Sequence, residues 1–144
     1  MNNLKAKNSH KLMQEKIIYN NNLPNAKQIY QFYLALGWEP ELGKTPEQLF
    51  KAMQGSWYLL CAWDGETLIG MARVVSDGYL NTYLCGLGVL PDYRHQGIGT
   101  KLTQMIIKAC EDEGLKPQFF CEEHLIPFYE NMGFSHFAAG MKKD

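Results

Sequence analysis

The stretch from Leu87 to Leu102 constrains the fold of this chain more than any other part of the sequence. It has the pattern of a strand end, a loop that carries Gly97 and Gly99, and the first turn of a helix. Glycine has no Cβ, so backbone N–H groups in this loop can lie close to a ligand. A helix N-terminus carries unpaired donors and about half a positive charge, which suits a phosphate group. The stretch therefore predicts a strand–loop–helix unit that binds an anion.

Three anion-binding patterns compete for this loop. A P-loop requires Lys and then Ser or Thr directly after its last glycine, whereas Gly99 is followed by Thr, Lys and Leu. A dinucleotide fingerprint requires a third glycine where Leu102 stands. The third pattern is Arg/Gln-x-x-Gly-x-Gly/Ala at a strand–helix junction, and residues 94–99 match it in full. The spacing therefore excludes the two nucleotide patterns and retains the third.

A second motif, F-Y-x-x-x-G-F, occupies residues 128–134, one helix and one strand after the loop. Two motifs in this order resemble the GNAT superfamily of acetyl-CoA-dependent N-acetyltransferases, and the resemblance covers roughly residues 17–137. It implies a mixed α/β fold with a central, mostly antiparallel twisted sheet. That sheet would splay apart between its fourth and fifth strands and be flanked by about four helices.

Periodicity and turn residues predict the elements of that fold independently of the resemblance. Apolar residues at one-face spacing, with capping residues before them, predict helices over about 25–36, 45–54, 100–113 and 125–131. Apolar runs between turn residues predict strands over about 16–19, 56–64, 67–75, 81–89, 117–121 and 134–139. Residues 1–15 are polar and lack periodicity, so we expect a loosely held segment ahead of a single domain at 16–144.

Composition limits the classes of function. The chain has 144 residues and a net charge of −1, so it has no basic field to attract nucleic acid. The longest apolar run, residues 57–63, is too short to span a bilayer, and no secretory signal opens the chain. The cysteines form no C-x-x-C pair, so we expect no metal site, no disulfide and a reducing cytoplasm: Cys61, Cys85, Cys110 and Cys121.

The resemblance implies specific roles around the loop. Pantetheine would pair with the strand at 87–89, and the pyrophosphate would lie on N–H groups of residues 96–100. Tyr129 would donate a proton to the leaving thiolate. A strand N–H near Val89 would stabilise the oxyanion. The predicted residues for binding acetyl-CoA, which needs no metal here, are Leu87, Gly88, Val89, Arg94, His95, Gln96, Gly97, Ile98, Gly99, Thr100 and Tyr129.

The general base is less well defined, because many relatives carry a carboxylate near position 86 and this chain has Gly86. Relatives commonly have Asn near position 122, where this chain has Glu122, which we take as the second predicted catalytic residue. Other residues remain open as the base: Glu123, His124 and Asp77. Cys85 is assigned to packing, because direct acetyl transfer needs no covalent enzyme intermediate.

The resemblance predicts direct acetyl transfer to a primary amine of a small-molecule acceptor. The acceptor would lie between the first two helices and the sheet, near Tyr33, Trp38, Glu39, Glu41, Tyr79 and Tyr83. The alternative is a CoA-binding sensor or interaction module with little catalysis, which the missing strand carboxylate favours. Few residues follow Phe134, so one sheet edge is expected to be open, to be covered by a second subunit in a homodimer or by the N-terminal segment.

Overall fold

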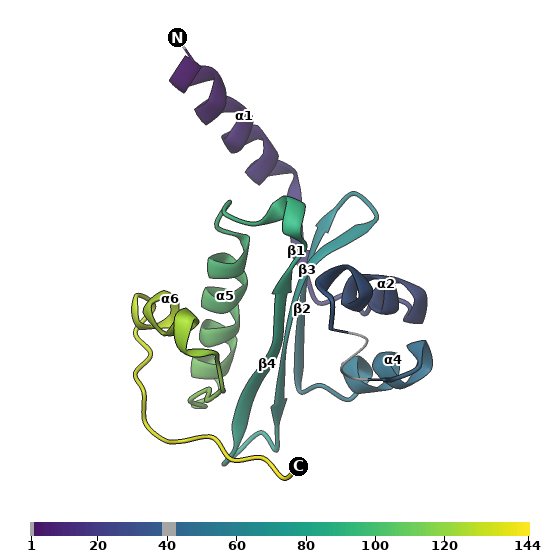
Figure 1. Ribbon diagram of the computed structural model, residues 1–144, viewed down its shortest axis with the longest axis vertical. Coiled ribbons are helices and arrows are strands. Elements are labelled where there is room, and N and C mark those ends of the chain that lie inside the picture. Colours follow the sequence, from purple (N-terminus) through teal and green to yellow (C-terminus); the bar gives the residue numbers. More distant parts are fainter. Residues whose placement is uncertain (1, 39–42) are drawn as a thin grey trace.

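The computed structural model describes residues 2–38 and 43–144, with a central sheet that has helices on both faces (Figure 1). The sheet is antiparallel and has the strand order β1-β2-β3-β4. Its strands are β1 Ile17–Asn20, β2 Tyr58–Asp64, β3 Thr67–Ser76 and β4 Thr82–Val89. These bounds confirm the first four predicted strands, because alternating apolar residues and tight turns define a meander locally.

Two helices cover one face of the sheet. α2, Ala26–Leu36, begins with a capping box between Asn25 and Gln28, and α4, Pro46–Gln54, begins with an equivalent box between Thr45 and Gln48. They bury a core against β2 and β3 that contains Ile29, Phe32, Tyr33, Leu49, Met53, Leu59, Cys61, Leu68 and Met71. Both helices were predicted from their caps and apolar faces.

A single long helix covers the other face. α5, Ile98–Asp112, begins two residues earlier than predicted, because Gly97 serves as its N-cap without a side-chain hydrogen bond. Leu102, Ile106 and Cys110 of its apolar stripe are buried in one core with residues of the sheet. The sheet residues are Leu60, Ala62, Ile69, Ala72, Val74 and Leu84. Three short elements follow or precede it: η1 Pro91–Tyr93, η2 Glu123–Leu125 and α6 Ile126–Glu130. The loop before α5 is thereby held at one end of the sheet.

The N-terminal segment is a helix, which the sequence patterns did not predict. α1, Asn2–Lys16, projects away from the rest of the chain (Figure 1). It contains good helix formers but no apolar face, so a search for periodicity does not detect it. With α1 the described residues contain five α-helices instead of about four. The division into a segment at 1–15 and a domain at 16–144 stays a prediction.

The last two predicted strands are not formed as predicted. Gln118 makes an isolated parallel bridge to Tyr83, and no strand is described over 117–121 or 134–139. A strand needs a neighbour for its backbone groups, and residues 134–139 have none among the described elements. The sheet therefore has four strands, and splaying between a fourth and a fifth strand stays a prediction. Of the helices described, none is long and apolar enough to cross a membrane.

Candidate functional site

The loop before α5 has the backbone geometry of an anion cradle. His95 has a φ of 60° and Gly97 a φ of 81°, both in the left-handed region. Left-handed residues beside right-handed ones turn successive N–H groups toward one concave face. The N–H groups of Ile98, Gly99 and Thr100 add to that face, because the first residues of a helix have no intrahelical acceptor. The predicted pyrophosphate cradle therefore fits the backbone that this chain forms.

Gly99 leaves room in the cradle. A Cβ built at Gly99 would meet only Val89 within 4 Å, at 3.8 Å from Cγ2. The carbonyl oxygen of Gly99 accepts a hydrogen bond from the Thr103 hydroxyl at 2.8 Å, which fixes the first turn of α5. The first turn is thus rigid while its glycine leaves room for a ligand.

Two side chains of the predicted motif fold back onto the backbone. Arg94 donates from Nε to the carbonyl oxygen of Val89 at 3.0 Å, and Gln96 donates from Nε2 to the carbonyl oxygen of Asp92 at 3.3 Å. A guanidinium has five N–H donors, so the bond to Val89 uses only one of them. Arg94 is therefore held between the end of β4 and the cradle.

A hydrogen bond that sequence reasoning missed anchors the lead-in to the loop. The Tyr93 hydroxyl donates to Oδ2 of Asp64 at 2.7 Å, and Lys16 Nζ lies 3.0 Å from Oδ1 of Asp64. The bond from Tyr93 and then the bond from Lys16 lower the pKa of the Asp64 carboxyl. Asp64 also raises the pKa of Tyr93. These residues lie far apart in sequence, so no local pattern signals the contact.

A bulge interrupts the pairing of β4 with β3. Residues 86–87 stand together opposite one residue of β3, since Met71 pairs with Gly88 and Arg73 with Cys85. Gly86 has a φ of 63°, which glycine adopts without strain. The bulge gives a structural reason for this glycine, and it lies just past the hydrogen bonds between β4 and residue 118.

On the edge of β4 that does not face β3, Gln118 is the neighbour, and it contacts only the first residues of the strand. Gln118 donates to the carbonyl oxygen of Thr82 at 2.9 Å and accepts from the N–H of Leu84 at 2.9 Å. Past these bonds, no strand of the described chain lies along the outer edge of residues 86–89. The N–H of Leu90 donates inward to Ile69 at 2.8 Å, so the N–H of the preceding Val89 points toward the open edge.

Packing of α2 accounts for Gly88. A Cβ built there would lie 2.6 Å from Cδ1 of Leu36 and 2.9 Å from Cη2 of Trp38. These distances are shorter than any van der Waals contact, so a larger residue would displace the end of α2. Close packing by the end of α2 therefore gives a reason for glycine at this position, while cofactor binding through its backbone stays a prediction.

Tyr129 lies in an aromatic cluster. Its ring is 9% exposed and its centroid lies 4.4 Å from that of Phe119 and 5.0 Å from that of Phe128. Burial, and next the nearby Cys121 thiol, raise the pKa of the Tyr129 hydroxyl. A raised pKa keeps this phenol protonated at neutral pH, as a proton donor requires. Its catalytic role stays a prediction.

The candidates for the base differ in their surroundings. Oε2 of Glu122 lies 3.2 Å from Nδ1 of His124, and both side chains are exposed. Asp77 accepts hydrogen bonds from the N–H groups of residues 79, 80 and 81, which lower its pKa to about 2. Such a carboxylate caps a turn and is a poor base at neutral pH. Burial raises the pKa of Cys85, which agrees with its assigned packing role.

The predicted acceptor region is partly assembled. The rings of Tyr33 and Trp38 meet edge to face at 5.5 Å between centroids, next to Gly86 and Gly88 of β4. Tyr83 instead packs on Phe120, and Tyr79 is 88% exposed at the β3–β4 turn. Two predicted members, Glu39 and Glu41, lie outside the described residues.

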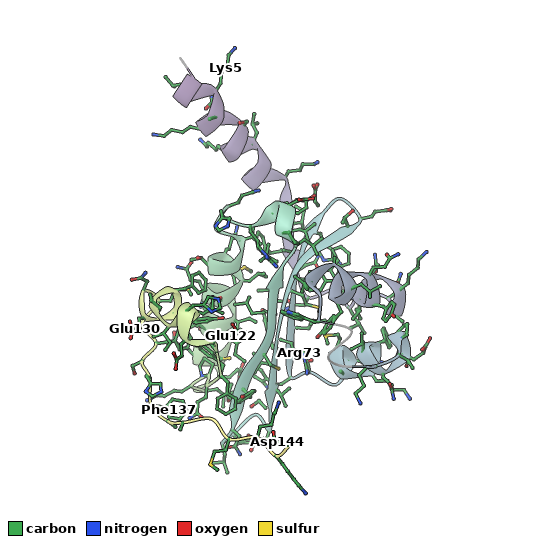
Figure 2. All side chains as sticks on the ribbon, viewed as in Figure 1. Lys5, Arg73, Glu122, Glu130, Phe137 and Asp144 are labelled. Atoms are coloured by element: carbon green, nitrogen blue, oxygen red, sulfur yellow. The ribbon has the colours of Figure 1, made fainter. Side chains whose placement is uncertain are left out.

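Sequence reasoning missed Arg73, which lies beside Tyr33 and Gly86. The available signal was a single cation within the otherwise apolar strand Thr67–Ser76. Figure 2 shows Arg73 on the side of the sheet that faces α4, and Glu122 on the side that faces α5. The two labelled side chains therefore lie on opposite faces of the sheet.

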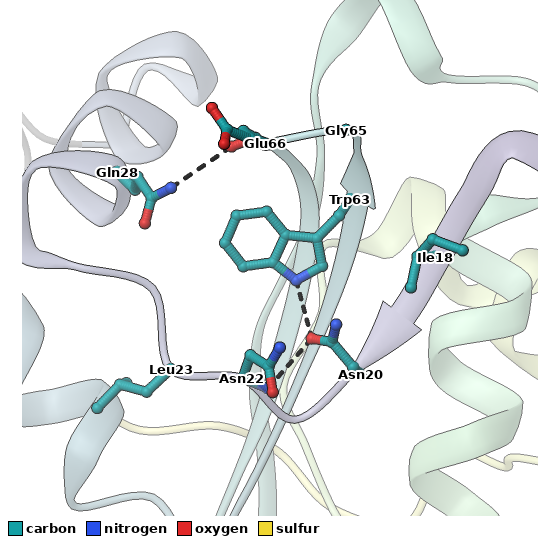
Figure 3. A pocket seen from close by; sticks show the side chains of 8 residues that line it. All are labelled: Ile18, Asn20, Asn22, Leu23, Gln28, Trp63, Gly65 and Glu66. Atoms are coloured by element: carbon teal, nitrogen blue, oxygen red, sulfur yellow. Dashed lines mark hydrogen bonds between the residues drawn. The ribbon is translucent and has the colours of Figure 1, made fainter.

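A separate hollow of about 500 Å³ opens on the α2 face at the β1 edge (Figure 3). Its polar groups bond to one another: Trp63 Nε1 donates to Oδ1 of Asn20 at 2.9 Å, and Gln28 Nε2 donates to the carbonyl oxygen of Glu66 at 3.4 Å. The cradle lies at α5, which packs on the other face of the sheet. Of the part of the chain that is described, no cluster of His, Cys, Asp and Glu has the makings of a metal site.

Comparisons with known proteins agree on one family. Residues 23–134 match the model of the acetyltransferase (GNAT) family. A GCN5-related chloroplastic N-acetyltransferase of Arabidopsis thaliana is 33% identical over 85 residues, which cover 55% of this chain and 33% of the relative. A histone acetyltransferase of Glycine max is 33% identical over 78 residues, which cover 54% of this chain and 34% of the relative. The chain thus spans about a third of the length of these curated relatives.

Solved structures match over nearly their whole length. A GNAT family acetyltransferase of Streptococcus pneumoniae has a TM-score of 0.72 and 29% identity, covering 89% of this chain and 96% of the other. A protein of unknown function from Staphylococcus aureus has a TM-score of 0.77 and 22% identity, and the match covers 89% of this chain and 98% of the other. The second likeness concerns the fold alone.

Proposed function

This chain belongs to the acetyltransferase (GNAT) family, whose members are acyltransferases that use acetyl-CoA, and we propose that it moves acetyl from acetyl-CoA directly to a primary amine of a small-molecule acceptor. One observation carries the proposal. The N–H groups at the start of α5 and the open outer edge of β4 lie at the same end of the sheet. That pairing offers one site for a pyrophosphate and another for an extended amide chain.

The open edge of β4 supports the cofactor's placement. The pantetheine arm would pair with the backbone of residues 87–89, where the described chain supplies no neighbouring strand. The pyrophosphate would lie on the N–H groups of residues 96–100, with Arg94 beside it. We also propose that the segment 117–121 diverges from β4 past Gln118, which would make the gap that holds this arm.

The chain's own groups suit each step of the transfer. The acceptor nitrogen attacks the thioester carbon, so a C–N bond forms and the C–S bond breaks. The N–H of Val89 faces the open edge and would stabilise the oxyanion, and one such donor contributes about 3–4 kcal/mol. Tyr129 would give its proton to the leaving thiolate. Glu122, directly or through water, would accept the proton that the amine loses.

The predicted assembly and location belong to the same proposal. Phe120 is 66% exposed and Phe137 65% exposed near the last part of the chain, which supports a homodimer that covers this edge. Sedimentation velocity at high protein concentration tests this dimer, and a monomer would contradict it. A cytoplasmic location is proposed from free cysteines alone, although one relative is chloroplastic.

Release of thiol from acetyl-CoA over a panel of small amines tests the function. We expect release that depends on one chemical class of amine. Binding of acetyl-CoA without turnover on any amine or peptide would instead favour a CoA-binding module, an alternative that Gly86 supports by leaving the strand without a carboxylate. Turnover on histone peptides but on no small amine would contradict the proposed acceptor class.

A further inference from the structure

Arg73 is a cation on the face of the sheet that otherwise carries an apolar core. Its Nη1 donates to the carbonyl oxygen of Ala52 at 3.4 Å and to Oγ of Ser56 at 3.3 Å, both long for hydrogen bonds of this type. Its Nε is buried and makes no hydrogen bond of standard geometry, although the guanidinium also interacts with the Tyr33 hydroxyl. Leaving a charged donor unsatisfied in a low-dielectric site is unfavourable, so this nitrogen favours any acceptor that can reach it.

No carboxylate of the described residues forms an ion pair with Arg73. The carbonyl groups at the end of α4 supply part of a negative charge, but a helix C-terminus amounts to only about half an elementary charge. A half-buried guanidinium is most stable when a carboxylate or phosphate faces its planar donors. Within the described part of the chain, no carboxylate therefore balances the charge of Arg73.

Gly86 leaves a space next to that guanidinium. A Cβ built at Gly86 would lie 3.7 Å from the Tyr33 hydroxyl oxygen and 3.8 Å from Nε of Arg73. Those distances are ordinary van der Waals contacts, and the three nearest atoms belong to these two side chains. This room holds little more than one carbon atom, so an acidic group must displace a neighbouring side chain to reach the Tyr33 hydroxyl and the Arg73 guanidinium.

We propose that the acceptor carries a carboxylate, and that Arg73 and Tyr33 bind it in the space beside Gly86. The inference rests on the proposed acetyl transfer and narrows its acceptor to an amino acid. Because Nε is closed to water, a neighbouring side chain must move when the carboxylate binds. The carboxylate of the acceptor thereby supplies the ion-pair partner that the described residues do not give Arg73.

The strand also limits the length of the acceptor. Gly86 lies three residues before Val89, and a strand rises about 3.3 Å per residue, so the two positions are roughly 10 Å apart. The reacting amine is therefore several bonds away from the carboxylate. An ω-amino acid fits this spacing, whereas an α-amine beside its own carboxylate does not.

Matched acceptors test the carboxylate directly. We expect kcat/KM for 6-aminohexanoate to exceed that for 6-aminohexanamide by at least about tenfold, since a hydrogen bond to a charged group is worth that much. Arg73→Gln should reduce the preference to near unity, raising KM more than it lowers kcat. Arg73→Lys should restore part of it, because the charge remains. Equal rates for both acceptors in the wild-type protein would overturn the proposal.

Two further variants separate recognition from folding. Tyr33→Phe keeps the ring and should lower the preference a few fold. Gly86→Asp should abolish it, since a built-in carboxylate fills the space, and a φ of 63° is one that Asp tolerates. Gly65→Asp is the control, with a φ of 59° and nothing within 4 Å of its Cβ. Equal preference in Gly86→Asp and Gly65→Asp would contradict the proposed site.

Different results would contradict the proposed acetyl transfer and the proposed carboxylate site at Arg73. If no amine releases thiol, acetyl transfer to a small amine is wrong. If amines with and without a carboxylate release thiol equally, acetyl transfer stands and only the Arg73 site is wrong. Isothermal titration with acetyl-CoA should give the same affinity for Arg73→Gln and the wild-type protein. If Arg73→Gln loses the preference for 6-aminohexanoate over 6-aminohexanamide while its affinity for acetyl-CoA is unchanged, the site is supported. If Arg73→Gln keeps that preference, the site is overturned.

Discussion

Arg94 donates its Nε–H to the carbonyl oxygen of Val89 at 3.0 Å and so joins the cradle to the end of β4. Val89 also presents its N–H toward the open edge, because the next N–H, from Leu90, bonds inward to Ile69. One residue of β4 thus contacts the proposed pyrophosphate site through its carbonyl group and the proposed thioester site through its N–H. The positions of the two sites are coupled by a single hydrogen bond.

Replacing Arg94 should weaken acetyl-CoA binding. Arg94→Gln removes a cation beside the cradle and the bond to Val89, so we expect the Kd to rise about tenfold or more. Arg94→Lys keeps the charge without the planar fork and should give an intermediate value. Isothermal titration measures both, with Lys108→Gln as an exposed control at the far end of α5. Equal affinities in all four proteins would remove Arg94 from the site.

Enlarging Gly88 should destabilise the fold. Gly88→Ala drives a methyl group into Leu36 and Trp38, which we expect to cost about 1–3 kcal/mol of unfolding free energy. Urea denaturation measures the loss. Leu36→Ala in the same background should recover part of it, because the closest clash is with Cδ1 of Leu36. Additive losses in the double variant would contradict this contact.

The stability of the protein should depend on pH through Asp77 in the turn between β3 and β4. Three N–H groups hold the folded pKa at about 2, below the usual value of 3.8, so the folded state binds fewer protons. Its stabilisation is therefore complete above about pH 4 and is lost as pH falls toward 2. Urea denaturation from pH 6 to pH 2.5 measures this effect. Asp77→Asn keeps an acceptor oxygen without the charge and should show a smaller decline; an identical decline would contradict the assignment.

Tyr129→Phe should lower kcat and leave cofactor binding nearly unchanged. The ring stays in its cluster with Phe119 and Phe128, while the proton donor is lost, which typically costs at least about 10²-fold. The raised pKa of Tyr129 also implies that the wild-type rate does not fall through loss of this proton until pH exceeds 10. Stopped-flow thiol detection measures the rate, and full activity in the phenylalanine variant would exclude the role.

Local patterns explain what was predictable about the fold. Capping boxes at Asn25 and Thr45 and the turn at Gly65 are defined by neighbouring residues, so the helices and the meander were found from sequence. α1 was missed because it has no apolar face, and its sequence therefore lacks the periodicity that reveals a helix. Residues 117–121 look like a strand, but forming one depends on a distant partner, and only Gln118 finds it.

In the candidate site too, features built from consecutive residues were predictable, and contacts between distant residues were not. The cradle at 94–100 follows from spacing alone, because its chemistry lies in consecutive backbone groups. The contact of Tyr93 with Asp64, and the meeting of Arg73 with Gly86, join residues that only the fold brings together. The packing of Leu36 and Trp38 against Gly88 was not foreseen for the same reason, since they lie far from it in sequence.

Titration of acetyl-CoA into Gly97→Asp tests the central claim most directly. A carboxylate at Gly97 would face the pyrophosphate at close range, and repulsion of about 1–4 kcal/mol corresponds to a Kd at least about tenfold higher. Gly114→Asp is the matched control at the other end of α5, with a φ of 72° against 81° at Gly97 and nothing within 4 Å of its Cβ. We predict weakened binding in Gly97→Asp and wild-type binding in Gly114→Asp. Unchanged affinity in Gly97→Asp would contradict the assignment of this loop to acetyl-CoA.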